Sequence, residues 1–251
     1  MFGNFFKKKL ATDHHHEKEP DNKSDLIFET MMTAINEKRK VDPLIGAKIG
    51  SKEIVQHLIA ALRTDKGVHI ESLLSALGAL AGYACQASIR AELIEAKGVA
   101  ENAVFAVANC VDGRKYYFGD LLNKPLAESQ YSVWSLAAGA AQQLGVKDML
   151  DLEGVFGYVT DSIGGENFGV PRIPEGHTPS DLPINFLKIH WPKLMPLIRR
   201  FCAQPSEWPV LFGLAIQEVL YMGQGTIDPA VALSIAMESA IPMSKVDLEA
   251  F

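Results

Sequence analysis

Residues 69–96 read HIESLLSALGALAGYACQASIRAELIEA and form the longest stretch of helical periodicity in the chain. The interior of this stretch is crowded with small residues, namely Ser75, Ala76, Gly78, Ala79, Ala81, Gly82, Ala84, Ala87 and Ser88. A glycine inside a helix costs roughly 1 kcal/mol relative to alanine, so its presence needs a reason in the packing. We therefore predict that another backbone packs closely here, and that residues 69–96 form the central helix of the fold.

Helical patterns also occupy most of the remaining chain. Gly50 and Ser51 divide the helical region before residue 62 into two parts, because glycine ends a helix and serine caps the next one. Pro192 and Pro196 divide 185–202 into short pieces, because an interior proline removes a hydrogen bond and clashes with the preceding turn. Another helix is expected to begin at Ser24. Four more are expected over residues 127–144, 148–163, 206–222 and 228–240.

Residues 103–118 break the helical pattern and predict a β-hairpin. The runs AVFAVANCV and KYYF are rich in β-branched and aromatic side chains, and Asp112-Gly113 lies between them. An Asp-Gly pair between such runs is a strong hairpin signal, because a two-residue turn needs positive φ at both central positions. The resulting register would place Val107 opposite Phe118.

These patterns predict a mostly α fold (α+β by strict count), in which about eight or nine helices form a globular domain around the small-residue-rich helix, with one inserted β-hairpin. We expect a disordered N-terminal tail over residues 1–23 and a frayed C-terminal tail over 243–251. Between them, residues 24–242 form one helical domain that contains the hairpin at 103–118 and a long Gly/Pro loop at 164–183. A domain boundary at this loop is the alternative, which is less favoured because the piece after it is small and broken by prolines.

The composition excludes several classes of protein. With 48% hydrophobic and 22% charged residues, most of the chain is typical of a packed globule. A net charge of −6, from 30 acidic and 24 basic residues, argues against nucleic acid as a partner. No window reaches the ~18 uninterrupted apolar residues of a membrane-spanning helix, so we expect no integral membrane association. The basic and aromatic start, MFGNFFKKKL, is compatible with weak contact to a membrane surface, although a disordered tail is favoured.

The three cysteines, Cys85, Cys110 and Cys202, lie far apart in apolar segments. An odd number without paired spacing argues against a disulfide framework and for a reducing compartment, with the cytoplasm as the default location. We expect no cofactor and no metal site. The cluster of histidine and acidic residues at 13–17 lies in the expected tail, where preorganised ligand geometry is absent.

The 164–183 loop, GGENFGVPRIPEGHTPSDLP, contains four glycines and four prolines and is the best candidate for a ligand site. Loops on rigid scaffolds often carry binding groups, and the acidic, amide and basic candidates here are Glu166, Asn167, Arg172 and His177. A second candidate surface, for protein contacts, combines the hairpin with the proline-containing helix. Aromatic and arginine side chains often anchor interfaces, and the candidates are Phe105, Val107, Tyr117, Trp191 and Arg199.

Two functions are consistent with these features. The hairpin is apolar on both faces and would be marginal alone, so we expect it either to be enclosed by helices or to meet a second chain. No group of residues forms a convincing catalytic constellation. We therefore expect a non-enzymatic protein-interaction or assembly protein, with homodimerisation through or near the hairpin. The alternative is a small-molecule-binding protein or enzyme whose pocket is closed by the 164–183 loop.

Overall fold

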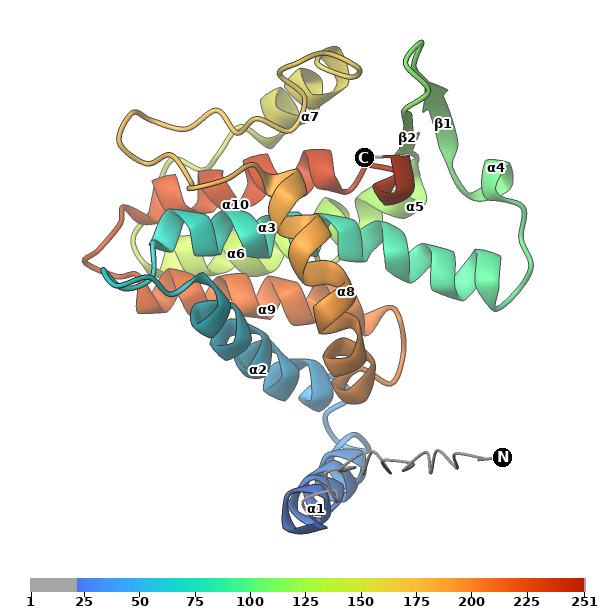
Figure 1. Ribbon diagram of the computed structural model, residues 1–251, viewed down its shortest axis with the longest axis vertical. Helices are drawn as coiled ribbons and strands as arrows, with labels where there is room; N and C mark the ends of the chain where they lie inside the picture. Colours follow the sequence, from blue (N-terminus) through green and yellow to red (C-terminus); the bar gives the residue numbers. More distant parts are fainter. Residues whose placement is uncertain (1–21, 251) are drawn as a thin grey trace, which may run out of the picture.

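The computed structural model describes residues 22–250, which form a mostly helical fold with one antiparallel β-hairpin, as the sequence predicts (Figure 1). The expected tail over residues 1–23 lies outside the described residues, apart from 22 and 23, which begin the first helix. The elements in chain order are α1 (Asn22–Lys38), α2 (Ile45–Leu62), α3 (Ile70–Ile89), the π-helical η1 (Arg90–Glu95), α4 (Glu101–Val104), β1 (Ala106–Asn109), β2 (Lys115–Phe118), α5 (Asp120–Asn123), the π-helical η2 (Lys124–Glu128), α6 (Val133–Gln143), α7 (Leu152–Asp161), α8 (Pro183–Phe201), α9 (Glu207–Met222), α10 (Pro229–Met243) and the 3-10 turn η3 (Leu248–Ala250).

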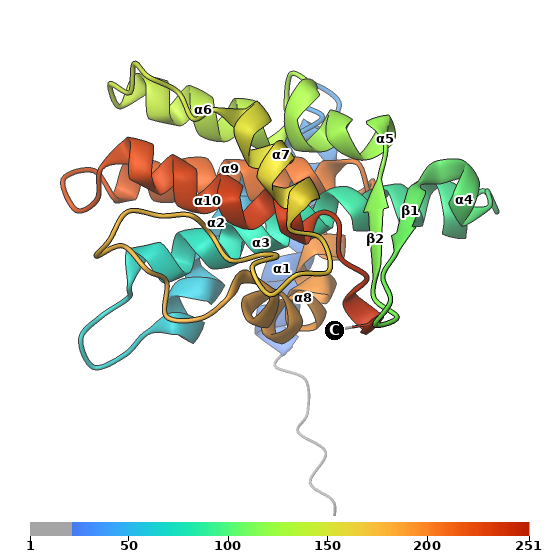
Figure 2. The same ribbon diagram turned by 90° about the horizontal axis from the view of Figure 1, so that it is seen from above.

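Helix α3 runs through the middle of the molecule and packs along α10 (Figures 1 and 2). A Cβ added at Gly82 would lie 1.9 Å from the carbonyl oxygen of Ala240, and one added at Gly78 would lie 2.2 Å from that of Ala236. No side chain fits at such separations, so glycine is what allows the two backbones to meet. The predicted close backbone contact is confirmed, and the partner is α10.

Buried polar contacts fix the axial position of α10 relative to α3. The hydroxyl oxygens of Ser75 and Ser239 lie 3.1 Å apart. Further along, the Gln86 amide donates to the carbonyl of Ser244 at 3.0 Å and to that of Val246 at 3.1 Å. A helix end leaves carbonyl groups without helical partners, and Gln86 satisfies one there. The chain therefore leaves α10 in a fixed direction, toward the hairpin.

The stretch Ile70–Glu95, which joins α3 and η1, is long and apolar enough to cross a membrane by length and composition alone. In the structure, 89% of its most apolar window is buried inside the molecule. Helices α8, α9 and α10 all pack against α3, so its apolar surface is the core of this helical fold.

Two helices are longer than the sequence patterns predict. Helix α2 passes through Gly50 without a break, because Gly50 is a site of close packing: an added Cβ would lie 2.8 Å from Phe201 Cβ. Helix α8 passes through Pro192 and Pro196. These prolines lie four residues apart on the exposed side of α8, so the carbonyl groups that lose their helical partners face water. The predicted breaks in both helices are therefore wrong.

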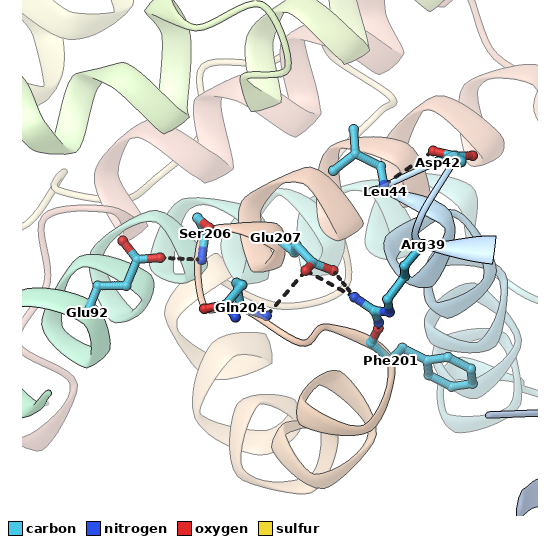
Figure 3. A network of polar contacts seen from close by, with 8 residues as sticks. All are labelled: Arg39, Asp42, Leu44, Glu92, Phe201, Gln204, Ser206 and Glu207. Carbon is cyan, nitrogen blue, oxygen red and sulfur yellow. Dashed lines mark hydrogen bonds and ion pairs between the residues drawn. The ribbon is translucent and has the colours of Figure 1, made fainter. Parts of the chain in front are cut away.

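A network of polar contacts fastens the N-terminal helices to the connection between α8 and α9 (Figure 3). Arg39 forms an ion pair with Glu207 at 3.1 Å, and Glu207 also accepts from the backbone N–H of Gln204 at 3.2 Å. On the other side of the connection, Glu92 accepts from the backbone N–H of Ser206 at 2.9 Å. Two carboxylates thus accept backbone N–H groups of this short connection and help to order it.

The hairpin forms where the sequence predicts it, but its register differs by one residue. Val107 lies opposite Tyr117 rather than Phe118. The N–H of Gly113 donates to the carbonyl of Cys110 at 3.0 Å, and Gly113 takes a positive φ of 88°. The connection is therefore a longer loop with glycine in the left-handed region, which is the common alternative to a two-residue turn.

The residues after α10 are part of the fold, contrary to the frayed tail expected over 243–251. Ser244, Lys245 and Val246 are at most 2% exposed. The N–H of Tyr117 donates to the carbonyl of Lys245 at 2.8 Å, which joins this segment to β2. The expectation of a frayed end is wrong for these residues because their backbone groups find partners in the hairpin and in Gln86.

Replacing Gly82 by alanine is expected to lower the free energy of unfolding by at least ~2 kcal/mol, because the new methyl group would overlap the Ala240 carbonyl and force α3 and α10 apart. The matched control is Gly139→Ala in α6, where nothing lies within 4 Å of an added Cβ. That change is expected to stabilise the protein by up to ~1 kcal/mol through helix propensity. Urea unfolding of both variants measures the difference, and equal stabilities would contradict the close contact.

Candidate functional site

The edge of β2 that does not pair with β1 is covered by residues 245–247, which follow α10. Besides the Tyr117–Lys245 bond, the N–H of Asp247 donates to the carbonyl of Lys115 at 3.3 Å. Tyr116 and Val246 form a β-bridge between these two bonds. Residues 245–247 therefore act as a short third strand, and β2 has no free edge.

The outer side of β1, by contrast, carries backbone groups that no described residue uses. In an antiparallel pair, residues that bond to the partner strand alternate with residues whose groups point away. Tyr117 and Lys115 direct their groups away from β1, so their partners, Val107 and Asn109, direct their N–H and C=O groups outward as well. Figures 1 and 2 show this edge on the side of the hairpin away from α10, where the short helix α4 leads into β1.

Apart from the shortness of β1, which has four residues, its open edge lacks the features with which proteins usually protect an exposed strand. Lysine, proline, bulges or a covering element are the common devices. The sequence VFAVANCV, from Val104 to Val111, contains no charged residue and no proline. Val111 at the tip is fully exposed. The edge is therefore uncharged and able to pair with another strand.

Arg90 holds the inner face of the hairpin in place. Its guanidinium group lies 4.3 Å from the ring centre of Tyr117 and 5.1 Å from that of Phe105. It also forms an ion pair with Glu101 at 2.6 Å, and its Nε donates to Gln86 at 3.2 Å. Arg90 begins the π-helical turn η1, a rare conformation that is frequent at functional sites. The hairpin is thus anchored firmly while its edge stays open.

A buried lysine supports the other face of the hairpin. Lys245 is 2% exposed, and no carboxylate of the described residues forms an ion pair with it. Its ammonium group donates to Asn123 Oδ1 at 3.3 Å and lies 5.3 Å from the ring centre of Phe118 and 5.5 Å from that of Phe156. Burial lowers the pKa of Lys245 to about 8, because the charged form loses its hydration.

The 164–183 loop is irregular, as predicted, and lies across α3 and α10 (Figure 2). Two of its predicted ligand-binding residues contact carboxylates of these helices. Arg172 binds Glu238, which is 4% exposed, at 2.7 Å. His177 Nδ1 lies 3.0 Å from Glu71, whose other oxygen lies 3.1 Å from His69. Burial alone would raise the pKa of Glu71, but the hydrogen bond with His177 and the nearby His69 hold it below its usual value.

The other two predicted loop residues, Glu166 and Asn167, are exposed. The loop surrounds a hollow of about 230 Å³, and its lining includes Val170, Ile173 and Leu182 but none of the four predicted residues. Among the side chains that the structure describes, those of residues 29–250, no group of three or more His, Cys, Asp or Glu is placed to hold a metal ion. A ligand site at this loop stays a prediction.

The predicted interface residues lie in different environments. Phe105 and Tyr117 are buried at the base of the hairpin, and Val107 is half-buried in β1. Trp191 lies in the core, where its ring packs edge-on against Tyr83 (4.9 Å) and lies near Trp208 and Phe212, whereas Arg199 is exposed on α8. The fold therefore brings the three hairpin residues together and does not join them to Arg199 in one surface patch.

Several residues that shape this region were missed in the sequence. Glu238 lies in the run ALSIAMESAIPM, and Lys245 lies between Ser244 and Val246 at the end of the same apolar segment. A single charged residue in such a run indicates a buried charge that needs a partner. Arg172, the partner of Glu238, is 66 residues away in the chain. The sequence therefore indicates that Glu238 needs a cationic partner, but it does not identify which residue that is.

Replacing Arg172 by leucine is expected to lower the free energy of unfolding by about 2 kcal/mol, because it leaves the carboxylate of Glu238 buried without a cation. The loss should be smaller than the ~3–5 kcal/mol typical of fully buried pairs, since Arg172 is 43% exposed. The double variant Arg172→Leu/Glu238→Gln should recover most of the stability. Urea unfolding measures all three proteins, and an equally unstable double variant would show that the pair is not the cause.

Replacing Lys245 by methionine is expected to stabilise the protein at pH 7 by up to about 3 kcal/mol, because it removes a buried charge. The folded pKa of about 8 lies below the ordinary value of 10.5, so the unfolded chain holds the proton more tightly. The wild-type protein should therefore gain stability relative to the variant as the pH rises from about 8 to 10.5. Denaturant unfolding across this range measures the difference, and a gap that does not narrow would refute the charge effect.

Comparison with known proteins adds no relative for this arrangement. No protein-family model matches the chain, and neither a curated protein nor a solved structure matches it. The open edge of β1 is therefore the candidate site on structural grounds alone.

Proposed function

We propose that this chain is a non-enzymatic assembly protein that pairs with a second copy of itself through the open edge of β1. The observation that carries this proposal is the set of outward-directed N–H and C=O groups of Val107 and Asn109, on a strand without protective charges. Addition of a strand to an exposed sheet edge is a common mode of protein recognition, in which backbone hydrogen bonds supply the affinity.

A second copy fits this edge better than an unrelated strand, because the geometry is self-complementary. When Ala108 lies opposite Ala108 of the partner, Val107 of each chain exchanges hydrogen bonds with Asn109 of the other. This arrangement uses all the free backbone groups of β1 in both copies. Alanine at the centre suits the close approach of a pair that does not exchange hydrogen bonds, since those Cα atoms lie only ~4.5 Å apart.

The alternative of a ligand pocket under the 164–183 loop has weaker support. Arg172 and His177, its main polar groups, already bind Glu238 and Glu71, and those contacts serve to hold the loop down. The three cysteines, including Cys110 beside the hairpin, are free thiols, which is consistent with the proposed location in a reducing compartment such as the cytoplasm.

The proposal predicts that Asn109→Pro weakens self-association. The N–H of Asn109 points outward, so proline removes a bond to the second copy and none of the bonds between β1 and β2. Asn109→Ala is the matched control, because it removes the same exposed side chain and keeps the N–H. The wild-type protein and the alanine variant should approach twice the monomer mass of 27.4 kDa in sedimentation equilibrium over micromolar concentrations, and the proline variant should stay monomeric.

Thermal unfolding of the three proteins serves as the control for folding. A monomeric wild-type protein at all these concentrations would refute the proposal, and so would equal dimerisation of the proline and alanine variants.

A further inference from the structure

His190 lies on the buried side of α8, the helix that packs against α2, α3 and α10. The residue is 5% exposed, and its Nδ1 atom is buried without a hydrogen-bond partner among the described residues. Native proteins pair the large majority of their buried polar atoms, so an unpaired ring nitrogen needs a reason. A leucine here would fill the same contact without leaving a polar atom unpaired.

The groups that act electrostatically on the His190 ring are cationic or become cationic in acid. Lys193 lies one turn further along α8, and His57 acts on the ring from α2. Helices α3 and α10 also pack against α8, but they contribute no charged or titratable group that acts on this ring. A proton on His190 would therefore lie near two like charges, with no carboxylate to offset them.

The other histidines that the structure describes are placed differently. His69 and His177 lie 3.1 and 3.0 Å from the oxygens of Glu71, so a positive charge on either ring has a partner. His57 is exposed, so water hydrates its charged form. Within the described part of the chain, only His190 combines burial with the lack of an anion. Burial is the main cause that holds the pKa of His190 below its ordinary value of 6.5.

The backbone of α8 is weakened around His190. Proline has no N–H group, so Pro192 and Pro196 remove two of the helical hydrogen bonds in this part of the helix. Segments with fewer protected backbone bonds are the ones that open locally at a low free-energy cost. The helix that carries the unpaired ring is thus also one that opens readily.

We propose that His190 makes α8 an acid-sensitive element: protonation of its ring releases the middle of α8 from α2 and exposes the apolar side of the helix. That side carries Leu187, Trp191 and Leu194, which are buried while the helix is in place. The open state binds the proton more tightly than the closed state does. The contact is therefore complete well above pH ~6.5 and is lost as the pH falls below that value. No residue of β1 takes part, so the release does not depend on self-association.

Hydrogen exchange of the full chain, followed by mass spectrometry at about pH 7.5 and about pH 5, tests the proposal. After correction for the intrinsic pH dependence of exchange, peptides from α8 should lose up to about thirtyfold in protection at the lower pH. This factor is the gain in proton binding of a histidine that has a pKa of ~6.5 in the open state and stays neutral in the closed one. Peptides from α10 should keep their protection. His190→Leu should abolish the loss in α8, because it leaves no ring to protonate.

A second variant, Lys193→Gln, removes one of the like charges from the exposed side of α8. It should reduce the loss about twofold, which is the usual magnitude for one such pair on a helix. The matched control is Lys52→Gln, which makes the same change on the side of α2 that faces α9 and should behave as the wild-type protein does.

Three results would overturn the proposal: equal protection of α8 at both pH values in the wild-type protein, an equal loss in the wild-type protein and the His190→Leu variant, or a loss in α10 as large as that in α8, which would indicate global unfolding. Circular dichroism at the higher pH verifies that each variant is folded.

Discussion

The contact between the backbones of α3 and α10 determines where almost everything else lies. Gly78 and Gly82 bring the two helix axes to a separation that any side chain would prevent. With that separation fixed, Ser75 meets Ser239 and Gln86 meets the end of α10. The chain that leaves α10 then has one direction to follow, and this direction supplies the third strand of the hairpin. The loss of helix propensity at two glycines is offset by packing along a whole helix.

Charged residues inside the fold are handled in two different ways. Glu71 and Glu238 project from the central helices toward the 164–183 loop and are met there by His177 and Arg172. These pairs hold down a segment that has little regular structure to fix it. Lys245 has no such partner among the described side chains and is stabilised by an amide oxygen and two aromatic rings instead. The first arrangement gives the loop one position, because a buried carboxylate without its cation is costly.

The sequence was informative where a pattern is local. The small residues of 69–96 indicated a close backbone contact, and the two β-rich runs around Asp112-Gly113 indicated a hairpin; both are present. The register was wrong by one residue because the same Asp-Gly pair is compatible with turns of different length. The effect of the prolines in α8 was predicted wrongly. A proline inside a helix leaves one carbonyl group without its hydrogen bond, and the cost is small where that carbonyl is exposed to water. Exposure depends on the tertiary structure, which the sequence pattern does not reveal.

The candidate site was harder to predict for the same reason. Whether a strand edge is open depends on which other segments pair with the sheet. Here residues 245–247 pair with β2, although they lie more than a hundred positions later in the chain. The residues that anchor the hairpin, Arg90, Phe105 and Tyr117, likewise come from three separate segments. No spacing rule links such residues, because the link is the packing of α3 against α10. By contrast, Arg172 and His177 were noticed as polar groups, and only the structure revealed their partners.

The separation of α3 and α10 in the chain has a consequence for synthesis on the ribosome. Helix α10 begins about 140 residues after α3 ends, so at ~5–20 residues per second the long apolar helix α3 waits on the order of ten seconds for its partner. During that time the groove along Gly78 and Gly82 is open to any other nascent chain. Exposed apolar surface of this kind makes an incomplete chain prone to aggregate, so the long separation of α3 from α10 makes this protein sensitive to the rate at which it is synthesised.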